Sequence, residues 1–589
     1  MNNPTQFYKS QIKSYQTQLD AFKSKLLVFS LARIIVYLVG VMGIYIYFHE
    51  ISIAVVIAIV ATATFLFLLS KHNDNKKQRD LVKTLLDINE EEIQIASGKF
   101  HHRLNGLKYQ DPNHFYSLDI DLFGRGSFFQ FINRTAITEG THNLADILKA
   151  NYTQYIEKRQ EAIKELSEKA TWRQEYTAKG YLINEETPTH IIVNWLKNYK
   201  PFLPKLMKWL PYIFSALSVA VITLTILKIV PIAYMVYWLL IGIAIIGVYF
   251  SKVTNLALYA TQVKDTFRQY ALLLKQIETE EFSSELLKEK QQAIILKGEK
   301  SSAIFTKFSK SLDALDNRNN MFFILLGNGF FLWDIMQSYK IEQWILEYGK
   351  TVDNWFEVVS FFDAYNSLGN YTFNHPEFVF PEISTAKAVI NAKNLGHPLL
   401  DKNKRVDSDL NIENEQFFIV TGANMAGKST FLRTVSLHIV MANVGLPVCA
   451  ESSSYSPVKL ITSMRTTDSL TDGSSYFFSE LTRLKLIVDA IKEESYFIVL
   501  DEILIGTNST DKAIGSRKFV EKLVAGNATG IIATHDLSLC EIEKELDDVK
   551  NYYFDADVVN DELYFDYKLK KGICQNMNAS FLLKKMEII

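Results

Sequence analysis

The chain has 589 residues, which is too long for one hydrophobic core, so several domains are expected. Its formal net charge of −2 excludes a global basic bias toward nucleic acid, and its 48% hydrophobic content is ordinary for a soluble protein. The three cysteines, Cys449, Cys540 and Cys574, have no paired spacing, which predicts reduced, buried thiols in a cytosolic domain.

The apolar residues are concentrated in two pairs of long stretches. The first pair, about 26–48 and 51–70, is separated only by His49-Glu50 and predicts a helical membrane hairpin within an N-terminal segment, 1–80. The second pair, about 210–227 and 232–250, predicts a helical membrane hairpin of the same kind. Lysines flank both pairs, so the positive-inside rule predicts a multi-pass membrane protein, in the inner or cytoplasmic membrane, with its remaining domains in the cytoplasm. Fully buried core helices are the alternative.

Residues 81–384, apart from the second hairpin, have the period of helices. Residues 253–320 are rich in Lys, Glu and Gln and predict an extended helical arm. The short apolar run 321–333 contains Gly327, Asn328 and Gly329, and we expect a buried helix there rather than a crossing. The run 341–368 predicts one further helix. Gly369, Asn370 and the segment with Pro376 and Pro381 should end it before a domain that begins near residue 385.

The stretch 417–435 carries the strongest chemical signal. A strand-like run, Phe417 to Thr421, enters Gly422-x-x-x-x-Gly427-Lys428-Ser429, and a helical pattern follows. Glycines let the backbone N–H groups turn toward phosphates, the helix start favours anions, Lys428 can reach the β- and γ-phosphates, and the Ser429 hydroxyl can bind Mg²⁺. We therefore expect a nucleoside triphosphate on Gly422, Ala423, Asn424, Met425, Ala426, Gly427, Lys428, Ser429 and Thr430.

Two further apolar runs end in polar residues with catalytic potential. Tyr496–Leu500 is followed by Asp501, predicted to hold Mg²⁺ directly or through water, and by Glu502, predicted to activate the attacking water as general base. The run Gly530–Thr534 is followed by His535, which we interpret as a sensor of the γ-phosphate rather than an ordinary surface histidine. Lys428, Glu502 and His535 are thus the predicted catalytic residues.

The segment 472–481 is a turn of small residues that opens a helix. Its N–H groups and serine hydroxyls, Ser475 among them, make an anion-binding helix start, but the sequence does not say whose phosphate it meets.

These segments, in this order, resemble the ATPase domain of the MutS family of mismatch-repair-type ATPases, a branch of the ABC ATPases. The resemblance rests on Asn424–Phe431, Ser475-x-Phe477-x-x-Glu480, Leu500-Asp501-Glu502, Gly506–Ser509 and Ala533–Asp536. Gly396–Leu400 and Phe565–Leu569 are similar to the family's entry to this domain and its closing strand. A weaker similarity covers 123–135 and a few residues beyond, which resemble the start of the family's helical core and lever.

The resemblance and the apolar stretches together predict a multidomain protein. After the N-terminal segment 1–80 with the first transmembrane hairpin comes an α-helical core and lever region, 81–384, which contains the second. An α/β P-loop ATPase domain of ABC/MutS type, 385–589, follows. The resemblance further implies ATP and Mg²⁺ as ligands and a homodimer in which two ATPase domains pair head to tail. Ser475 would then contact the γ-phosphate bound to the partner chain, and residues around Arg405 and Val406 would flank adenine.

The sequence also departs from the family. Mismatch-binding members begin with a reader domain carrying a Phe-x-Glu motif, whereas this chain has a predicted membrane hairpin there. Phe48-His49-Glu50 spells the motif inside the hairpin turn, so mismatch reading is not expected.

The function expected from these observations is a membrane-anchored, MutS-like ATPase whose nucleotide cycle moves helical levers. The arm's lysines could clamp DNA, but interleaved glutamates are equally typical of a solvated helix face. A transporter-like ABC machine and a membrane scaffold that binds ATP without using it are the alternatives.

Overall fold

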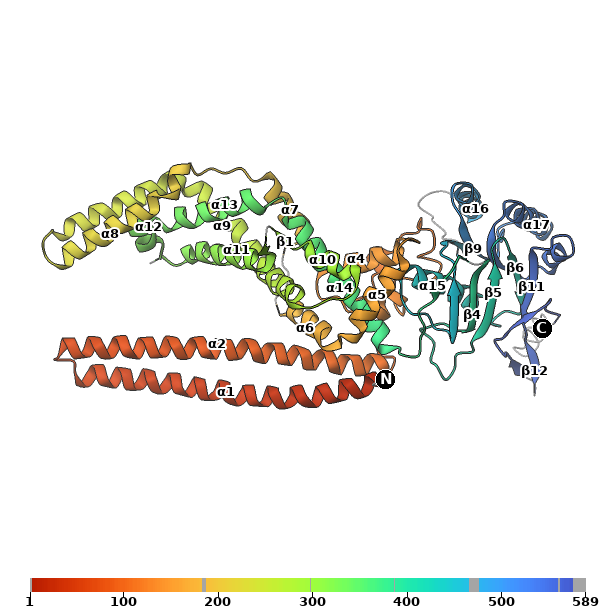
Figure 1. The fold of residues 1–589 in the computed structure, drawn as a ribbon, viewed down its shortest axis with the longest axis horizontal. Helices are drawn as coiled ribbons and strands as arrows, with labels where there is room; N and C mark the ends of the chain where they lie inside the picture. The colour runs from red at the N-terminus through yellow and green to blue at the C-terminus, as the bar shows by residue number, and fades with distance from the viewer. Residues whose placement is uncertain are drawn as a thin grey trace.

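The computed structural model describes residues 3–182, 187–296, 298–321, 323–385, 387–465, 476–559 and 562–575. The molecule is elongated and multidomain: a mixed α/β domain occupies one end, a helical region the middle, and two helical arms project away together toward the other end (Figure 1). The described amino-terminal end lies near the middle of the molecule, at the base of one arm.

The first arm is a pair of long antiparallel helices, α1 (Pro4–Ile46) and α2 (Ile51–Ala96). Each continues without a break from an apolar outer part into a polar inner part, so the predicted 26–48 and 51–70 are the outer portions of longer helices. Small residues let the two backbones approach, because a Cβ at Gly40 would lie 2.9 Å from the Ala61 Cβ. Most large apolar side chains of the outer part are exposed.

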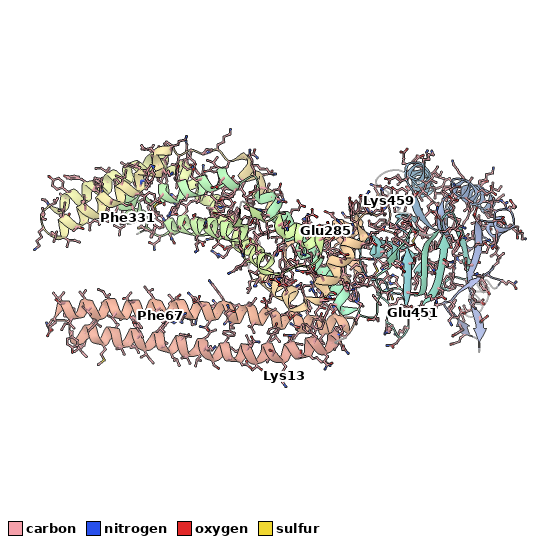
Figure 2. All side chains as sticks on the ribbon, in the orientation of Figure 1. Lys13, Phe67, Glu285, Phe331, Glu451 and Lys459 are labelled. Atoms are coloured by element: carbon pink, nitrogen blue, oxygen red, sulfur yellow. The ribbon has the colours of Figure 1, made fainter. Side chains whose placement is uncertain are left out.

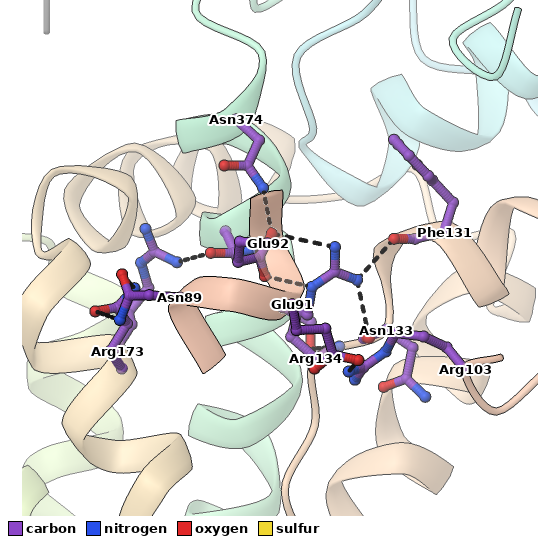
Figure 3. A network of polar contacts seen from close by, with 12 residues as sticks. Asn89, Glu91, Glu92, Arg103, Phe131, Asn133, Arg134, Arg173 and Asn374 are labelled. Carbon is purple, nitrogen blue, oxygen red and sulfur yellow. Dashed lines mark hydrogen bonds and ion pairs between the residues drawn. The ribbon is translucent and has the colours of Figure 1, made fainter. Parts of the chain in front are cut away.

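A buried polar network holds the base of this arm (Figure 3). The Arg134 guanidinium meets the carboxylate of Glu92 on α2, with Nε 2.5 Å from Oε1. Asn370 and Asn374, on α14 (Val352–Asn374), donate to the same carboxylate at 3.0 Å each. Glu92 is almost fully buried, so these partners are what make its charge tolerable. The network ties the first arm to the helix that leads into the α/β domain.

The second arm is built from four helices. They are α8 (Leu210–Ile226), α9 (Ile232–Thr279), α11 (Ser301–Asp316) and α13 (Trp333–Tyr348). Helix α9 runs without interruption from the apolar stretch into the amphipathic arm, and aromatic rings fill the space between it and α11 and α13. Among the residues that the structure describes, three helices, α1, α2 and α9, are long and apolar enough to cross a membrane, and α8 is shorter.

The prediction of one buried helix over 321–333 holds only for part of the segment, because Asn328, Gly329 and Phe330 are buried and the described residues before them are not. The residues form a π-helical turn (Phe323–Gly327) and a short helix, α12 (Asn328–Phe331), and Met321, Leu325 and Leu326 are exposed. Helix α12 packs on α9 so closely that a Cβ at Gly242 would lie 2.2 Å from the carbonyl oxygen of Gly329. The segment therefore lies against the second apolar hairpin, in the outer part of the arm (Figure 2, Phe331).

Two further expectations for this region are also corrected. The single helix expected over 341–368 is two helices, because α13 ends at Tyr348 and α14 begins at Val352. Of the residues expected to end it, Gly369 and Asn370 lie inside α14, which continues to Asn374 and ends just before Pro376. Gly369 instead lets α5 (Ile156–Glu168) pack closely, since a Cβ there would lie 3.0 Å from the Leu166 Cβ.

The main sheet of the α/β domain has the strand order β14-β11-β6-β10-β9-β8, and only β14 is antiparallel. All six residues of the central strand β6 are buried. The strands are β6 (Phe417–Gly422), β8 (Lys459–Ser463), β9 (Tyr496–Asp501), β10 (Thr529–Ala533), β11 (Val549–Phe554) and β14 (Leu569–Lys571).

Helix α15 (Lys428–Val444) lies between this sheet and the helical region, which explains why its buried residues cover all sides. A second sheet, of order β3-β7-β4-β5, borders the main one. Its strands are β3 (Glu382–Ile383), β4 (Ala388–Leu395), β5 (Ser408–Glu413) and β7 (Ser452–Tyr455). The other elements of the domain are α16 (Tyr476–Glu493), α17 (Ser509–Ala525), the 3₁₀ segment Leu537–Lys544, β12 (Asp557–Val559) and β13 (Glu562–Tyr564).

Short elements complete the helical region. They are α3 (Phe128–Ile132), α4 (Thr138–Lys149), α6 (Ala170–Tyr181), α7 (Thr189–Asn198), α10 (Glu285–Gln292), the hairpin β1 (Ile295–Leu296) and β2 (Glu299–Lys300), and 3₁₀ turns at Leu107–Tyr109, Lys205–Lys208 and Asn317–Asn319.

Candidate functional site

The candidate site lies where three parallel strands end side by side. In the sheet register Asp501 at the end of β9 is paired with Ala533 of β10, and Ala533 is paired with Val420 of β6. The loops that follow these strands therefore leave the sheet at one edge, which is where ligands bind in open α/β sheets.

The loop after β6 turns sharply into α15. Met425 and Gly427 have positive φ angles, +67° and +103°, and glycine adopts such angles without strain. Space is also limited, since a Cβ at Gly427 would lie 3.2 Å from the Tyr567 ring. Helix α15 begins at Lys428, so the N–H groups of its first turn face this loop, an arrangement that attracts anions.

The Lys428 side chain crosses the inside of the loop. Its Nζ donates to the carbonyl oxygens of Gly422 (2.8 Å) and Ala423 (3.1 Å) and lies 3.2 Å from Nε2 of His535. Burial lowers the pKa of Lys428, while the carboxylates of Asp501 and Glu502 act in the opposite direction. The side chain is thus a mostly buried cation held beside two acids.

Ser429 and Asp501 meet across the loop. The Ser429 hydroxyl donates to Oδ2 of Asp501 at 2.6 Å, although 72 positions separate the two residues. Burial raises the pKa of Asp501, and the hydrogen bond from Ser429 opposes that rise. Within the described ranges, no group of three or more His, Cys, Asp or Glu could hold a metal ion. A hydroxyl and one carboxylate suit Mg²⁺, which keeps several waters and shares its shell with phosphates.

Glu502 and His535 form the next pair. His535 Nε2 lies 3.0 Å from Glu502 Oε1, and Lys512 Nζ lies 3.7 Å from the other carboxylate oxygen. The hydrogen bond with His535 is the main reason why the pKa of Glu502 is lowered, so the carboxylate is ionised and able to accept a proton. Glu502 has a φ of +44°, and its N–H is held by the Ala533 carbonyl at 3.0 Å. Such strained backbone needs support from its surroundings.

A buried carboxylate provides that support. Glu480 on α16 accepts hydrogen bonds from the N–H groups of Leu504 and Ile505, the latter at 3.2 Å. It thereby fixes the turn that follows Glu502. The sequence comparison included Glu480 in a motif but assigned it no role.

The cavity between these groups has a volume of about 770 Å³. Of the predicted residues, those that line it are Asn424, Met425, Gly427, Lys428, Ser429, Thr430, Asp501, Glu502 and His535, together with Arg405 and Val406. Gly422, Ala423 and Ala426 lie behind the loop surface and are buried. Ser475 lies outside the residues that the structure describes. The adjacent Phe477 contacts the turn after Glu502, because a Cβ at Gly506 would lie 2.9 Å from the Phe477 Cβ.

Sequence reasoning missed other lining residues, among them His397, Phe554 and Tyr567. Tyr567 arrives from the chain segment before β14, and Phe554 from the end of β11. The segments of His397 and Tyr567 were recognised only as the beginning and end of the domain, and nothing in their local pattern indicates a place in the cavity.

Comparison with known proteins agrees with this geometry. The family profile of MutS domain V matches residues 418–585, which include the loop, both acids and His535. The similarity to the MutS family therefore lies in this carboxyl-terminal domain. It is 34% identical to human "MutS protein homolog 4" over 224 residues, 36% of this chain and 23% of the relative.

Similar values hold for prokaryotic MutS relatives. The "DNA mismatch repair protein MutS" of Methanococcoides burtonii is 33% identical over 219 residues, 36% of this chain and 24% of the relative. The protein of the same name from Staphylococcus haemolyticus is 28% identical over 241 residues, 40% of this chain and 27% of the relative. The chain thus spans about a quarter of the length of the curated MutS relatives it matches. The family profile, which matches residues 418–585, includes neither of the two apolar hairpins.

Proposed function

We propose that this chain is a membrane-anchored ATPase that binds ATP with Mg²⁺ in the cavity beside β6 and hydrolyses it. The observation that carries the proposal is the convergence of Lys428, the Ser429–Asp501 pair and the Glu502–His535 pair on one cavity of about 770 Å³. Similarity to the MutS family supports it.

Each group has a role that its position favours. The N–H groups of the loop and of the first turn of α15 bind phosphate oxygens. When ATP binds, Lys428 donates to the β- and γ-phosphates in place of the loop carbonyls of Gly422 and Ala423. Glu502 orients and deprotonates the attacking water, and His535, hydrogen-bonded to it, senses the γ-phosphate. Ser429 and Asp501 would hold Mg²⁺, whose charge offsets that of the phosphates.

The adenine would lie beside Arg405 and Val406. An ion pair with Asp407, 2.5 Å from carboxylate oxygen to Nε, holds the Arg405 side chain at the cavity. Tyr567 adds an aromatic surface on the same cavity.

Two such domains would pair head to tail. Large apolar side chains are exposed at and around the cavity, among them Met425 on the loop, Ile505 after Glu502 and Phe478 near the start of α16. A second copy placed there would cover them and bring its Ser475 to the γ-phosphate. Helix α15, which contacts both the sheet and helices α4 and α5, offers a path from the site to the arms.

The membrane part of the proposal rests on the outer parts of the arms. Helices α1, α2 and α9 each have an apolar stretch between the turn at the tip of the arm and the nearest lysine on the same helix. Each stretch is about 30 Å long, the thickness of a bilayer core, and the one charged residue in the three stretches is Arg33 on α1. The lysines Lys25, Lys71 and Lys252 mark the ends of these stretches. Both arms point the same way, so one bilayer can hold both tips (Figure 1).

Replacing the proposed base tests the ATPase proposal. We expect Glu502→Gln to lower ATP turnover at least ~100-fold while ATP binding stays within a few-fold, because only proton acceptance is removed. Glu521→Gln, on the far part of α17 and ion-paired with Arg517, is the matched control and should keep full turnover. Trapped with ATP and Mg²⁺, the Glu502→Gln protein should sediment as a dimer. Unchanged turnover would contradict the assignment of the base.

DNA is a second candidate partner, because two of the relatives above carry the name of mismatch repair proteins. Some basic residues of the second arm favour a solvated helix face instead, because Lys264 pairs with Asp316 and Arg268 pairs with Asp313. Filter binding of a duplex at low and moderate salt decides: a DNA clamp should bind at low salt and lose affinity steeply as salt rises.

A further inference from the structure

A groove lies at the base of the second arm, outside the ATP site. It runs between α7, the segment 199–202 and the first turns of α9 beyond the apolar stretch, and its volume is about 900 Å³. Its lining residues are Ile191, Asn194, Trp195, Asn198, Tyr199, Lys200, Pro201, Phe202, Lys252, Asn255, Leu256 and Tyr259. This lining has two lysines and three asparagines, and none of these residues is acidic.

One wall of the groove is aromatic. The rings of Trp195 and Tyr259 stack with centroids 5.8 Å apart and an interplanar angle of 15°, and Tyr199 meets Trp195 edge-on at 6.0 Å. Such rings, apolar in body and polar at the tip, are typical of the boundary between lipid and water.

The floor of the groove is rigid. Glu342, which is fully buried on α13, accepts hydrogen bonds from the N–H of Phe202 (2.7 Å), the hydroxyl of Tyr199 (3.1 Å) and the N–H of Leu203 (3.3 Å). One carboxylate thus fixes the loop that carries Lys200, so the groove is formed before any ligand arrives.

The two lysines are positioned at the end of the apolar stretch. Lys252 is the first charged residue after Ile232–Phe250, and its Nζ lies 5.9 Å from the centre of the Phe202 ring. Lys200 lies in the segment between α7 and α8, before the other apolar helix of this arm begins. The carboxylate of Glu342 interacts electrostatically with Lys252, but its oxygens already accept hydrogen bonds from the loop. Asn255 and Tyr259 follow Lys252 by about one and two helical turns.

We propose that this groove binds the headgroup of an anionic phospholipid. The inference rests on the membrane part of the proposed function, because it places Lys252 at the level where the hydrocarbon ends and phosphates begin. The lysines and asparagine amides supply donors for a phosphate, and the aromatic wall and Leu256 accommodate the upper acyl chain. Continuity with the apolar surface of α9 lets the lipid enter from the bilayer without leaving it.

A second groove on the same level supports this assignment. It has a volume of about 620 Å³, and Lys208, Lys307 and Lys340 line it beside Trp209 and Tyr212, with Glu347 as its one acid. The base of the second arm therefore presents lysines and aromatic rings on two sides.

The test uses the full chain in lipid nanodiscs that contain phosphatidylglycerol and phosphatidylcholine in equal amounts. After extraction, native mass spectrometry counts which lipid remains bound. We expect the wild type to retain phosphatidylglycerol preferentially and Lys200→Gln/Lys252→Gln to lose that preference by roughly 30-fold, as expected for two lysines near an anionic surface. Lys197→Gln is the matched control, because Lys197 lies three positions from Lys200 but pairs with Asp353 at 2.8 Å, and it should retain the preference.

Three outcomes would overturn the inference. They are an unchanged preference in the double variant, an equal loss in Lys197→Gln, or displacement of the lipid by a short DNA duplex at moderate salt. Failure of the wild type to insert into nanodiscs would remove the membrane anchor and this site with it. Insertion without any lipid preference would remove only the site, and ATP turnover measured on the same samples reports the ATPase proposal independently.

Discussion

At the scale of single residues, buried titratable groups in the α/β domain decide both chemistry and stability. Lys428 is stabilised as a cation by two acids at one end of α15, and three turns further along the same helix His438 lies fully enclosed. Its Nε2 is 3.3 Å from the Ser453 hydroxyl. Burial lowers the pKa of His438 to about 4, and burial does the same for His397 at the cavity.

The first prediction concerns the pH dependence of stability. An unfolded histidine takes up a proton near pH 6.5, whereas folded His438 resists it until about pH 4, so stability falls as the pH drops through this window. We expect His438→Gln to lose about 2 kcal/mol less than wild type between pH 6.5 and pH 5. Urea denaturation at the two pH values measures the difference. The exposed His190→Gln serves as control, and a wild-type-like loss in His438→Gln would contradict the prediction.

At the scale of elements, close packing and buried charge hold helices that are distant in the sequence. The contact of α12 with α9 depends on two glycines, Gly242 and Gly329, because their backbones lie too close for a Cβ. The contact of α2 with α14 depends on Glu92 and its partners (Figure 3).

The second prediction tests the packing of α12. Gly242→Ala should lower the free energy of unfolding by about 1–3 kcal/mol, since the added methyl group would overlap the Gly329 carbonyl and push α12 away. Gly247→Ala lies on the same helix with open space around the site and should be neutral. Thermal unfolding of both variants in detergent gives the comparison, and equal melting temperatures would show that α12 does not pack as described.

The third prediction tests the network at the base of the first arm. Arg134→Gln leaves the buried Glu92 carboxylate without its cationic partner, which should cost about 3–5 kcal/mol. Burial acts to raise the pKa of Glu92, but Arg134, Arg103 and Asn374 together lower it below the ordinary carboxyl value. The wild type should therefore also lose stability as the pH falls below the ordinary carboxyl range. Arg79→Gln breaks only a half-exposed pair with Asp80 on the same helix and should change stability by less than about 1 kcal/mol. Denaturation at neutral pH distinguishes the two.

At the scale of the whole molecule, the outer ends of both arms carry exposed apolar side chains and lie on the same side, far from the α/β domain (Figures 1 and 2). The turn with Phe48 and the turn with Ile229 are the outermost points of the two arms, and both side chains are exposed. In a bilayer that holds both arms, these turns face the side opposite to the ATPase domain.

The fourth prediction tests that topology. Cysteines introduced at Glu50 and Ile229 should react with a membrane-impermeant maleimide in intact cells, whereas a cysteine at Lys288 should react only after lysis. The native cysteines are buried and give little background. Labelling of Lys288→Cys in intact cells, or protection of both turns, would rule out the proposed orientation.

Local sequence determined a great deal about this protein. The phosphate-binding type of loop at 422–429, the strands before Asp501 and His535, and the apolar stretches are properties of neighbouring residues, so periodicity and turn chemistry reveal them without any fold. The loop motif and its companions were also specific enough to indicate the resemblance to the MutS family, and the profile match over residues 418–585 confirms that resemblance for this domain.

Only the tertiary structure decided which of these pieces meet. Ser429 bonds to Asp501 and Lys428 lies beside His535 because β6, β10 and β9 are neighbours in the sheet, an order that the chain does not spell out. Three other features also depend on the tertiary structure: Tyr567 lies at the cavity, Gly369 lies inside a helix, and 323–331 packs on an apolar hairpin. In each case the favourable contact is with residues far along the chain, and that long-range packing outweighs the local preference on which sequence reasoning depends.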